Sequence, residues 1–232
     1  MKKVVVLSGA GMSAESGLQT FRDADGLWEG HDVMTVASVE GWQANPSLVL
    51  DFYNQRRAQL LEVEPNAGHQ LLVELQRIYN VTVVTQNVDD LHERAGSKDV
   101  IHLHGELLKS QSSADSTLVY NCQTDINLGD LCDLGSQIRP AIVWFGEMVP
   151  MLEVAIPEVI DADAIIIVGT SMQVYPAASL AQYASPGCPI YYVDKRPAVN
   201  EAVSVLDDLT VIAEPASSGL VKVKQLLAEH FS

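Results

Sequence analysis

A glycine-rich segment, Gly9-Ala10-Gly11-Met12-Ser13-Ala14, directly follows the apolar run Val4–Leu7. It fits the G-x-G-x-x-G/A pattern, in which the first glycine permits a tight turn, the second lets the backbone approach a pyrophosphate, and the last small residue allows close helix packing. An ordinary glycine turn is the alternative, but the position after a first strand favours nucleotide binding. No acidic residue ends a second strand about 20 positions later. Asp194, which follows Ile190–Val193, is therefore the better candidate for holding a ribose.

Polar residues also follow three later apolar runs. These clusters are Gln86-Asn87-Val88-Asp89, His102-Leu103-His104-Gly105-Glu106 and Gly169-Thr170-Ser171. Each cluster alone is typical of a capped helix or a turn. Ligands of open parallel sheets bind at the carboxyl ends of the strands, however, so several clusters at one edge indicate a site. A histidine suits proton abstraction near neutral pH, although a lone histidine more often has a structural role, and we interpret His102 in that way.

The elements that must position these residues alternate between strand and helix. Between the apolar, β-branched runs lie helix-like segments at Asn66–Arg77 and Leu220–Phe231. This alternation predicts an α/β fold, a doubly wound parallel sheet with helices on both faces. The runs that we interpret as its strands are Val4–Leu7, Val81–Thr85, Val100–Leu103, Ala141–Phe145, Ala164–Val168, Ile190–Val193 and Thr210–Ile212.

Two intervals break the alternation. Residues 28–61 look helical, and residues 107–139 are polar and poorly periodic. We expect both to be insertions that form a smaller lobe, on a main domain made of about 1–27, 62–106 and 140–232. A cleft between two lobes is a common place for a ligand.

Composition narrows the classes of function. The 232 residues include 14 Lys+Arg and 30 Asp+Glu, a formal net charge of −16, which argues against binding nucleic acid or anionic lipid and suits basic partners such as lysine-rich protein segments. Three cysteines, Cys122, Cys132 and Cys188, are too few for a disulfide framework, which indicates a reducing compartment. No apolar run approaches the length of a membrane span. We therefore expect a soluble, cytoplasmic protein.

Six motifs in order resemble the sirtuins, the NAD-dependent protein lysine deacylases, over nearly the whole chain. The likeness is greatest to the bacterial desuccinylase/demalonylase class. It implies a Rossmann-like domain with a small lobe, and NAD bound in the cleft as a consumed co-substrate. The motifs are Gly9–Gly17, Phe21-Arg22, Thr85–Asp89, His104-Gly105, Val143–Glu147 and Gly169–Ser171.

The resemblance also implies roles for individual residues. His104 would be the general base, and Gln86, Asn87 and Asp89 would hold the nicotinamide and its ribose. Lysine would leave together with nicotinamide and O-acyl-ADP-ribose. Asp194 stands where the family commonly has asparagine. Its carboxylate would accept hydrogen bonds from ribose hydroxyls and repel a 2′-phosphate, which favours NAD over NADP. The other expected NAD contacts are Gly9, Ala10, Gly11, Ala14, Glu15, Phe21, Arg22, Gly169, Thr170, Ser171 and Ala216.

Acyl preference depends on a second pair of residues. Tyr53 and Arg56 are three positions apart, would share a helix face, and resemble the family's Tyr-x-x-Arg pair for negatively charged acyl groups. A guanidinium binds a carboxylate through paired, charge-assisted hydrogen bonds, and Ala24 would leave room for a succinyl chain. An ordinary amphipathic surface helix with salt bridges is the alternative. The acylated lysine's peptide would add a strand near Phe145–Val149, with Val143, Trp144, Phe145 and Gly146 in contact.

This chain differs from the family in the ligands of the structural zinc, which usually are four cysteines. Between Glu106 and Arg139 this chain has only Cys122 and Cys132 and no histidine, and Ser112 and Gly129 stand near positions where cysteines are expected. Nearby aspartates could complete only a weak site. We therefore predict that zinc is absent and that the lobe is held by its own packing. These aspartates are Asp115, Asp125, Asp130 and Asp133.

Three rival functions remain at this point. A hydride-transferring oxidoreductase would form NADH, a protein ADP-ribosyltransferase would label protein from NAD, and a non-catalytic NAD-sensing module would bind NAD without turnover. The presence of Asn87, Asp89 and His104 counts against the last.

Overall fold

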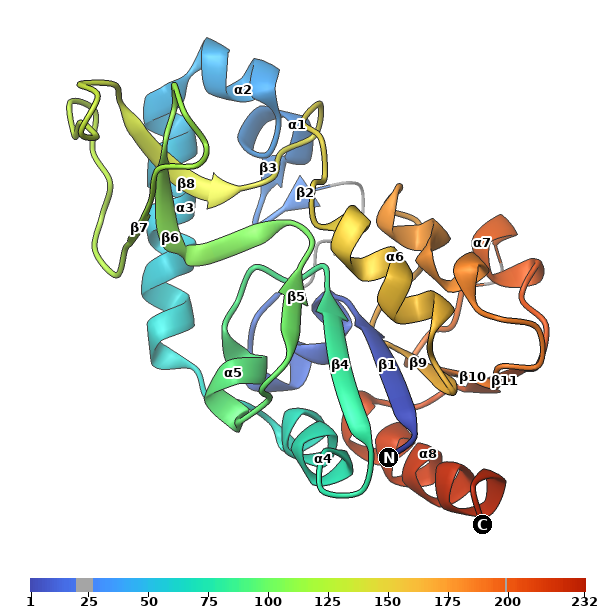
Figure 1. Cartoon of the computed structure of the whole chain (residues 1–232). Helices are drawn as coiled ribbons and strands as arrows, with labels where there is room; N and C mark the ends of the chain where they lie inside the picture. The colour runs from blue at the N-terminus through green and yellow to red at the C-terminus, as the bar shows by residue number, and fades with distance from the viewer. Residues whose placement is uncertain (20–26, 199) are drawn as a thin grey trace.

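A six-stranded parallel sheet forms the centre of the computed structural model, which describes residues 1–19, 27–198 and 200–232 (Figure 1). Its strand order is β11-β10-β9-β1-β4-β5, and every neighbouring pair is parallel. The predicted α/β fold is therefore confirmed. The strands are β1 (Lys3–Ser8), β4 (Asn80–Thr85), β5 (Val100–His102), β9 (Ala164–Val168), β10 (Ile190–Val193) and β11 (Leu209–Ile212).

Helices cover both faces of this sheet, because successive side chains of a buried strand point to opposite sides. Val4 and Val6 of β1 pack in one apolar cluster with α4 (Ala67–Leu75) and α8 (Ala216–His230). Val5 and Leu7 pack in the other cluster with α6 (Leu152–Ile160), η3 (Ala177–Tyr183) and α7 (Glu201–Ser204). A short helix, α5 (Leu91–Ala95), follows β4. Each face of the sheet thus has its own core.

The order of the strands reverses at β1. From β1 the chain continues to β4 and β5 on one side and returns to β9, β10 and β11 on the other. Open α/β sheets bind ligands at the carboxyl ends of the strands, beside the point where the strand order reverses. In Figure 1 the arrow of β4 points toward the second lobe.

The second lobe contains a three-stranded antiparallel sheet of order β7-β6-β8, formed by β6 (Gly105–Ser112), β7 (Val119–Asn121) and β8 (Ile138–Ile142). Our interpretation of 141–145 as a strand of the parallel sheet is wrong, because β8 ends at Ile142 and pairs with β6. Ile142 and Trp144 are buried in a separate apolar cluster of this lobe, and such burial gives the same apolar run as a central strand does. The lobe also contains β2 (Leu27–Trp28), β3 (His31–Asp32), α1 (Val33–Val36), α2 (Val39–Ala44) and α3 (Pro46–Glu62).

Helix α3 is fastened to the lobe by two buried side chains. Asn54 donates from Nδ2 to the Ile126 carbonyl (3.0 Å) and accepts from the Ile126 N–H (2.9 Å). Arg57, only 1% exposed, donates from Nε to the Leu107 carbonyl (3.1 Å) and from Nη1 to Asn54 Oδ1 (2.8 Å). Burial lowers the pKa of Arg57, and nearby Cys122 and Asp125 partly oppose that shift.

The cysteines of the lobe take part in local hydrogen bonds. Cys132 Sγ donates to Ser112 Oγ (3.2 Å), and Cys122 Sγ donates to the Thr124 carbonyl (3.3 Å). Within the described ranges, no group of three or more His, Cys, Asp or Glu is placed to hold a metal ion, so these residues do not fit a tetrahedral zinc site. Nor does any helix in those ranges have the length and apolar character needed to cross a membrane.

Candidate active site

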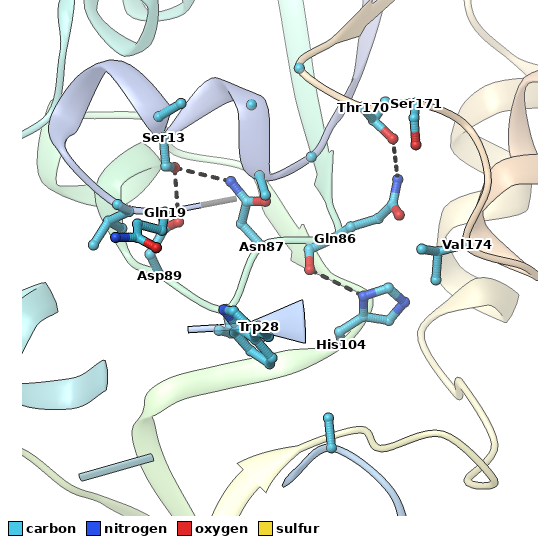
Figure 2. A pocket seen from close by; sticks show the side chains of 18 of the residues that line it. Ser13, Gln19, Trp28, Gln86, Asn87, Asp89, His104, Thr170, Ser171 and Val174 are labelled. Atoms are coloured by element: carbon cyan, nitrogen blue, oxygen red, sulfur yellow. Dashed lines mark hydrogen bonds between the residues drawn. The ribbon is translucent and has the colours of Figure 1, made fainter. Parts of the chain in front are cut away.

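A cavity of about 650 Å³ opens where the strand order reverses, between the carboxyl ends of the parallel strands and the small lobe (Figure 2). Both lobes contribute to it, as the sequence predicted for a cleft. Of the predicted residues, those lining the cavity are Gly9, Ala10, Gly11, Ala14, Tyr53, Arg56, Gln86, Asn87, Asp89, His104, Val143, Trp144, Phe145, Gly146, Gly169, Thr170, Ser171, Asp194 and Ala216. The predicted Phe21, Arg22 and Ala24 lie outside the described residues.

The glycine turn packs against the loop that follows β9. Gly9 N donates to the Val168 carbonyl (3.1 Å), and Gly11 N donates to the Gly169 carbonyl (2.8 Å). A β-carbon on Gly11 would lie 2.8 Å from Gly169 Cα, and one on Gly169, whose φ is +62°, would lie 2.1 Å from Met12 N. The glycines are therefore required where two backbones meet, and the turn continues as η1 (Ala10–Met12) and η2 (Ala14–Ser16).

Glu15, an expected NAD contact, is not among the residues that line the cavity. Its carboxylate accepts hydrogen bonds from Ser217 N (3.2 Å) and Ser217 Oγ (2.6 Å) in the first turn of α8. A carboxylate there stabilises the exposed N–H groups of a helix N-terminus. Glu15 therefore ties the glycine turn to α8, whose first residue, Ala216, does line the cavity.

Ser13, for which we predicted no separate role, joins Asn87 and Asp89, two polar residues that follow β4. Its Oγ donates to Asp89 Oδ2 (2.8 Å) and accepts from Asn87 Nδ2 (3.0 Å), as Figure 2 shows. Burial raises the pKa of Asp89, and the hydrogen bonds from Ser13 and Leu91 N partly offset that rise. The hydroxyl thus fixes both side chains, and its place on the turn beside these clusters was the available signal.

The His104 ring lines the cavity, and its Nε2 has no hydrogen-bond partner among the described residues. Its Nδ1 lies 3.1 Å from the Gln86 carbonyl oxygen, which can only accept, so Nδ1 carries the proton and Nε2 keeps its lone pair. Burial lowers the pKa of His104, and the hydrogen bond to Gln86 partly opposes this. His104 is therefore a neutral base at pH 7. Gln86 itself is held by the bond from its Nε2 to Thr170 Oγ1 (3.2 Å).

His102 has the structural role that we expected. Its Nε2 contacts Glu93 Oε1 (2.7 Å), and its Nδ1 contacts the Asn87 carbonyl (3.1 Å). Burial opposes the charged ring, but these two partners outweigh it and raise the pKa of His102. The ring therefore supports the backbone of Asn87 through its contact with that residue's carbonyl.

Two further histidines are buried beneath the site, with ring centroids 4.9 Å apart. His92 Nε2 lies 2.9 Å from Ser8 Oγ, and His69 Nδ1 accepts from Asn66 N (3.2 Å). Burial lowers the pKa of His69 to about 4 and that of His92 to about 3. Both rings are therefore neutral near pH 7.

One wall of the cavity contains two donors, from Tyr53 and Arg56, without acceptors among the described residues. Tyr53, fully buried, accepts a hydrogen bond from Trp144 Nε1 (3.0 Å). Burial raises the pKa of Tyr53 well above its usual value, so the phenol keeps its proton. Arg56 Nε is buried and has no hydrogen-bond partner among the described residues, and its guanidinium lies 5.1 Å from the Phe52 ring centroid. The predicted pair therefore does share one wall of the cavity.

The segment expected to bind peptide is partly occupied by the protein itself. Phe145 N donates to the Ala37 carbonyl (2.9 Å), and Val39 N donates to the Phe145 carbonyl (3.3 Å). Gly146, with φ +92°, makes no backbone hydrogen bond to any described residue. Backbone pairing with a substrate is thus available at Gly146 rather than at Phe145.

On the opposite side of the cavity, Asp194 follows the end of β10. Its Oδ1 accepts from Arg196 N (2.8 Å). Lys195 and Arg196 line the cavity beside it. This part of the cavity therefore combines a carboxylate that can accept hydroxyls with two cationic side chains.

Comparisons with known proteins agree with this geometry. The family model described as "Sir2 family" matches residues 9–176. An NAD-dependent protein deacylase of Helicobacter pylori is 62% identical over 196 residues, covering 84% of this chain and 86% of that protein. One of Bacteroides thetaiotaomicron is 50% identical over 236 residues, covering 98% of each.

Solved structures match the fold as well. A complex of a Sir2 homolog with NAD has a TM-score of 0.86 and 36% identity, covering 100% of this chain and 91% of the other. A complex described as Sir2 with a p53 peptide and NAD+ has a TM-score of 0.79 and 28% identity, covering 97% and 93%.

Proposed function

The chain belongs to the Sir2 family, and we propose that it is an NAD-dependent protein lysine deacylase that prefers succinyl and malonyl groups and also removes acetyl groups. The observation that carries the acyl preference is the pair of unpaired donors on α3. Tyr53 O–H and Arg56 Nε–H have no acceptor among the described residues, and both residues line the same cavity as His104. A carboxylate at the end of an acyl chain would supply that acceptor.

Charge favours the same assignment. Arg56 makes no ion pair with any residue in the described part of the chain, although the protein carries a net charge of −16. A guanidinium keeps its charge in proteins and binds carboxylates through charge-assisted hydrogen bonds. An acetyl group lacks only the charged end, so it enters the cavity without using this pair.

The remaining residues suit the chemistry of the family. NAD supplies an electrophilic ribose carbon on which the acyl oxygen acts. Asn87 and Asp89, fixed by Ser13, hold the nicotinamide end, and the backbone of the glycine turn accommodates the pyrophosphate. His104 Nε2 then accepts a proton from a ribose hydroxyl, because its lone pair faces the cavity.

Peptide binding needs few sequence-specific contacts. An acylated lysine entering beside Gly146 pairs through its main chain, which reads the backbone rather than the flanking side chains. We therefore propose that the acyl group, more than the surrounding sequence, selects the substrate.

The test is mass spectrometry of matched succinyl-, malonyl- and acetyl-lysine peptides incubated with the protein, with and without NAD. We expect NAD-dependent removal of all three groups, fastest for succinyl and malonyl, with release of nicotinamide. Equal or faster removal of acetyl would defeat the acyl preference. NADH formation, or transfer of labelled ADP-ribose to protein without deacylation, would replace the deacylase assignment by one of the rival functions.

A further inference from the structure

The indole of Trp144 lies directly against the phenol of Tyr53. We propose that Trp144 is a positioning residue for acyl choice, because its N–H orients the Tyr53 hydroxyl so that the phenolic proton points at the carboxylate of a charged acyl group. This inference rests on the proposed deacylase function and adds a residue that does not itself touch the carboxylate.

The direction of the hydrogen bond carries the argument. An indole nitrogen can only donate, so the Tyr53 oxygen must be the acceptor in the 3.0 Å contact. The phenol has one proton, and the hydroxyl has no second partner among the residues that the structure describes. Because a donor occupies the Trp144 side, the proton points away from Trp144, and we infer that it points toward the cavity that Tyr53 lines. Both side chains are buried, at 0% and 3% exposure, so their hydrogen bond is shielded from bulk solvent.

The indole is itself held on several sides. The Arg139 guanidinium lies 4.0 Å from the Trp144 ring centroid, and the Trp42 ring centroid lies 5.4 Å away. Glu147 joins the group, since its carboxylate accepts from Trp144 N (2.8 Å) and from Arg139 Nη2 (2.6 Å). Trp144 is therefore a rigid donor, and a rigid donor selects one orientation of the phenol before substrate binds.

The consequence differs between substrates. A succinyl or malonyl carboxylate accepts the oriented phenolic proton, whereas an acetyl group has no atom at that position. A change that frees the Tyr53 hydroxyl to rotate should therefore weaken the use of charged acyl groups more than the use of acetyl.

The experiment is a double-mutant cycle between Trp144→Phe and Tyr53→Phe, with kcat/KM measured on succinyl- and acetyl-lysine peptides. Trp144→Phe keeps an aromatic ring but removes the N–H, and it should lower the succinyl-to-acetyl ratio about three- to tenfold. In the Tyr53→Phe background the same change should lower the ratio no further. Trp42→Phe is the matched control, because Trp42 packs on the same ring but its indole donates no hydrogen bond to a described residue.

A measurement on the indole itself does not depend on the folding of Trp144→Phe. The chain has three tryptophans, so a ¹⁵N–¹H spectrum shows three indole signals. Tyr53→Phe should move one of them upfield as that N–H loses its acceptor, and three unmoved signals would overturn the proposal. If the wild-type protein removes succinyl groups but Trp144→Phe leaves the ratio unchanged, only the role of Trp144 falls. If the wild-type protein removes no acyl group with NAD, the proposed function falls as well.

Discussion

Replacing Arg56 by methionine should separate charged from uncharged acyl substrates. Methionine retains an apolar stem that can pack on Phe52, whose ring centroid lies 5.1 Å from the Arg56 guanidinium. The change therefore removes the positive charge and the donors while leaving most of the packing. Since Arg56 makes no ion pair with a described residue, the change leaves no described carboxylate without its partner.

The size of the effect follows from the interactions lost. A hydrogen bond to a charged group contributes roughly 1.5–3 kcal/mol. Arg56 is only half-buried, so one to two such bonds near the lower end give about 2–4 kcal/mol. At about 1.4 kcal/mol for each factor of ten, kcat/KM for a succinyl-lysine peptide should fall roughly 30- to 1000-fold. For an acetyl-lysine peptide the change should stay within about threefold, because no charged contact is lost.

The assay follows nicotinamide release and peptide mass for succinyl, acetyl and butyryl peptides of one sequence. Butyryl has the same chain length as succinyl but lacks the carboxylate, so Arg56→Met should bring the two rates together. Gln55→Met is the matched control, since Gln55 is the exposed neighbour on α3 and does not line the cavity. A parallel loss of succinyl and acetyl activity would refute the reasoning.

Three other predictions concern the base, the buried histidines and the lobe. His104→Ala should abolish removal of every acyl group. Because burial lowers the pKa of His104, kcat/KM of the wild-type protein should decline only below pH 6.5, and a midpoint above pH 6.5 would contradict the role of His104 as the base. In the folded protein, His69 has a pKa of about 4, and His92 also takes up its proton at a lower pH than it does in the unfolded chain. The free energy of unfolding should therefore fall as pH drops from 6.5 to about 4. His69 alone contributes about 3 kcal/mol of that loss, measured by urea unfolding, and a flat profile would refute it. A chelator should leave Tm unchanged, and a fall in Tm with chelator would argue for bound zinc. Arg57→Met should lower the free energy of unfolding by about 2–3 kcal/mol, because the Leu107 carbonyl loses its donor.

Local patterns predicted the main sheet well. Runs such as Val4–Leu7 and Ala164–Val168 are buried on both faces, so they read as continuous apolar segments and were placed in the correct sheet. The run at 141–145 has the same composition but packs into the core of the small lobe. Tertiary contacts decide which core buries an apolar segment, so the composition of the segment alone does not predict it. For the same reason β6 was not predicted, since most of it lies in the polar, poorly periodic segment 107–139.

The sequence predicted which residues line the site better than it predicted the hydrogen bonds between them. Motif order placed His104, Asn87 and Asp89 at one edge of the sheet, and they do line one cavity. The bond from Trp144 to Tyr53 joins residues 91 positions apart, and no spacing rule links them. The motif around Glu15 likewise gives no sign of its partner Ser217, which comes from the far end of the chain.

Helix α3 has a consequence for anyone who wishes to engineer this protein. One face carries Tyr53 and Arg56 into the cavity, and the adjoining face carries Asn54 and Arg57 into the framework of the lobe. Grafting the whole helix from a relative with another acyl preference would exchange both sets together, and a misfolded chimera would then be mistaken for a failed specificity switch. Substituting only the cavity-facing positions keeps the scaffold intact, so substrate range can diversify one residue at a time.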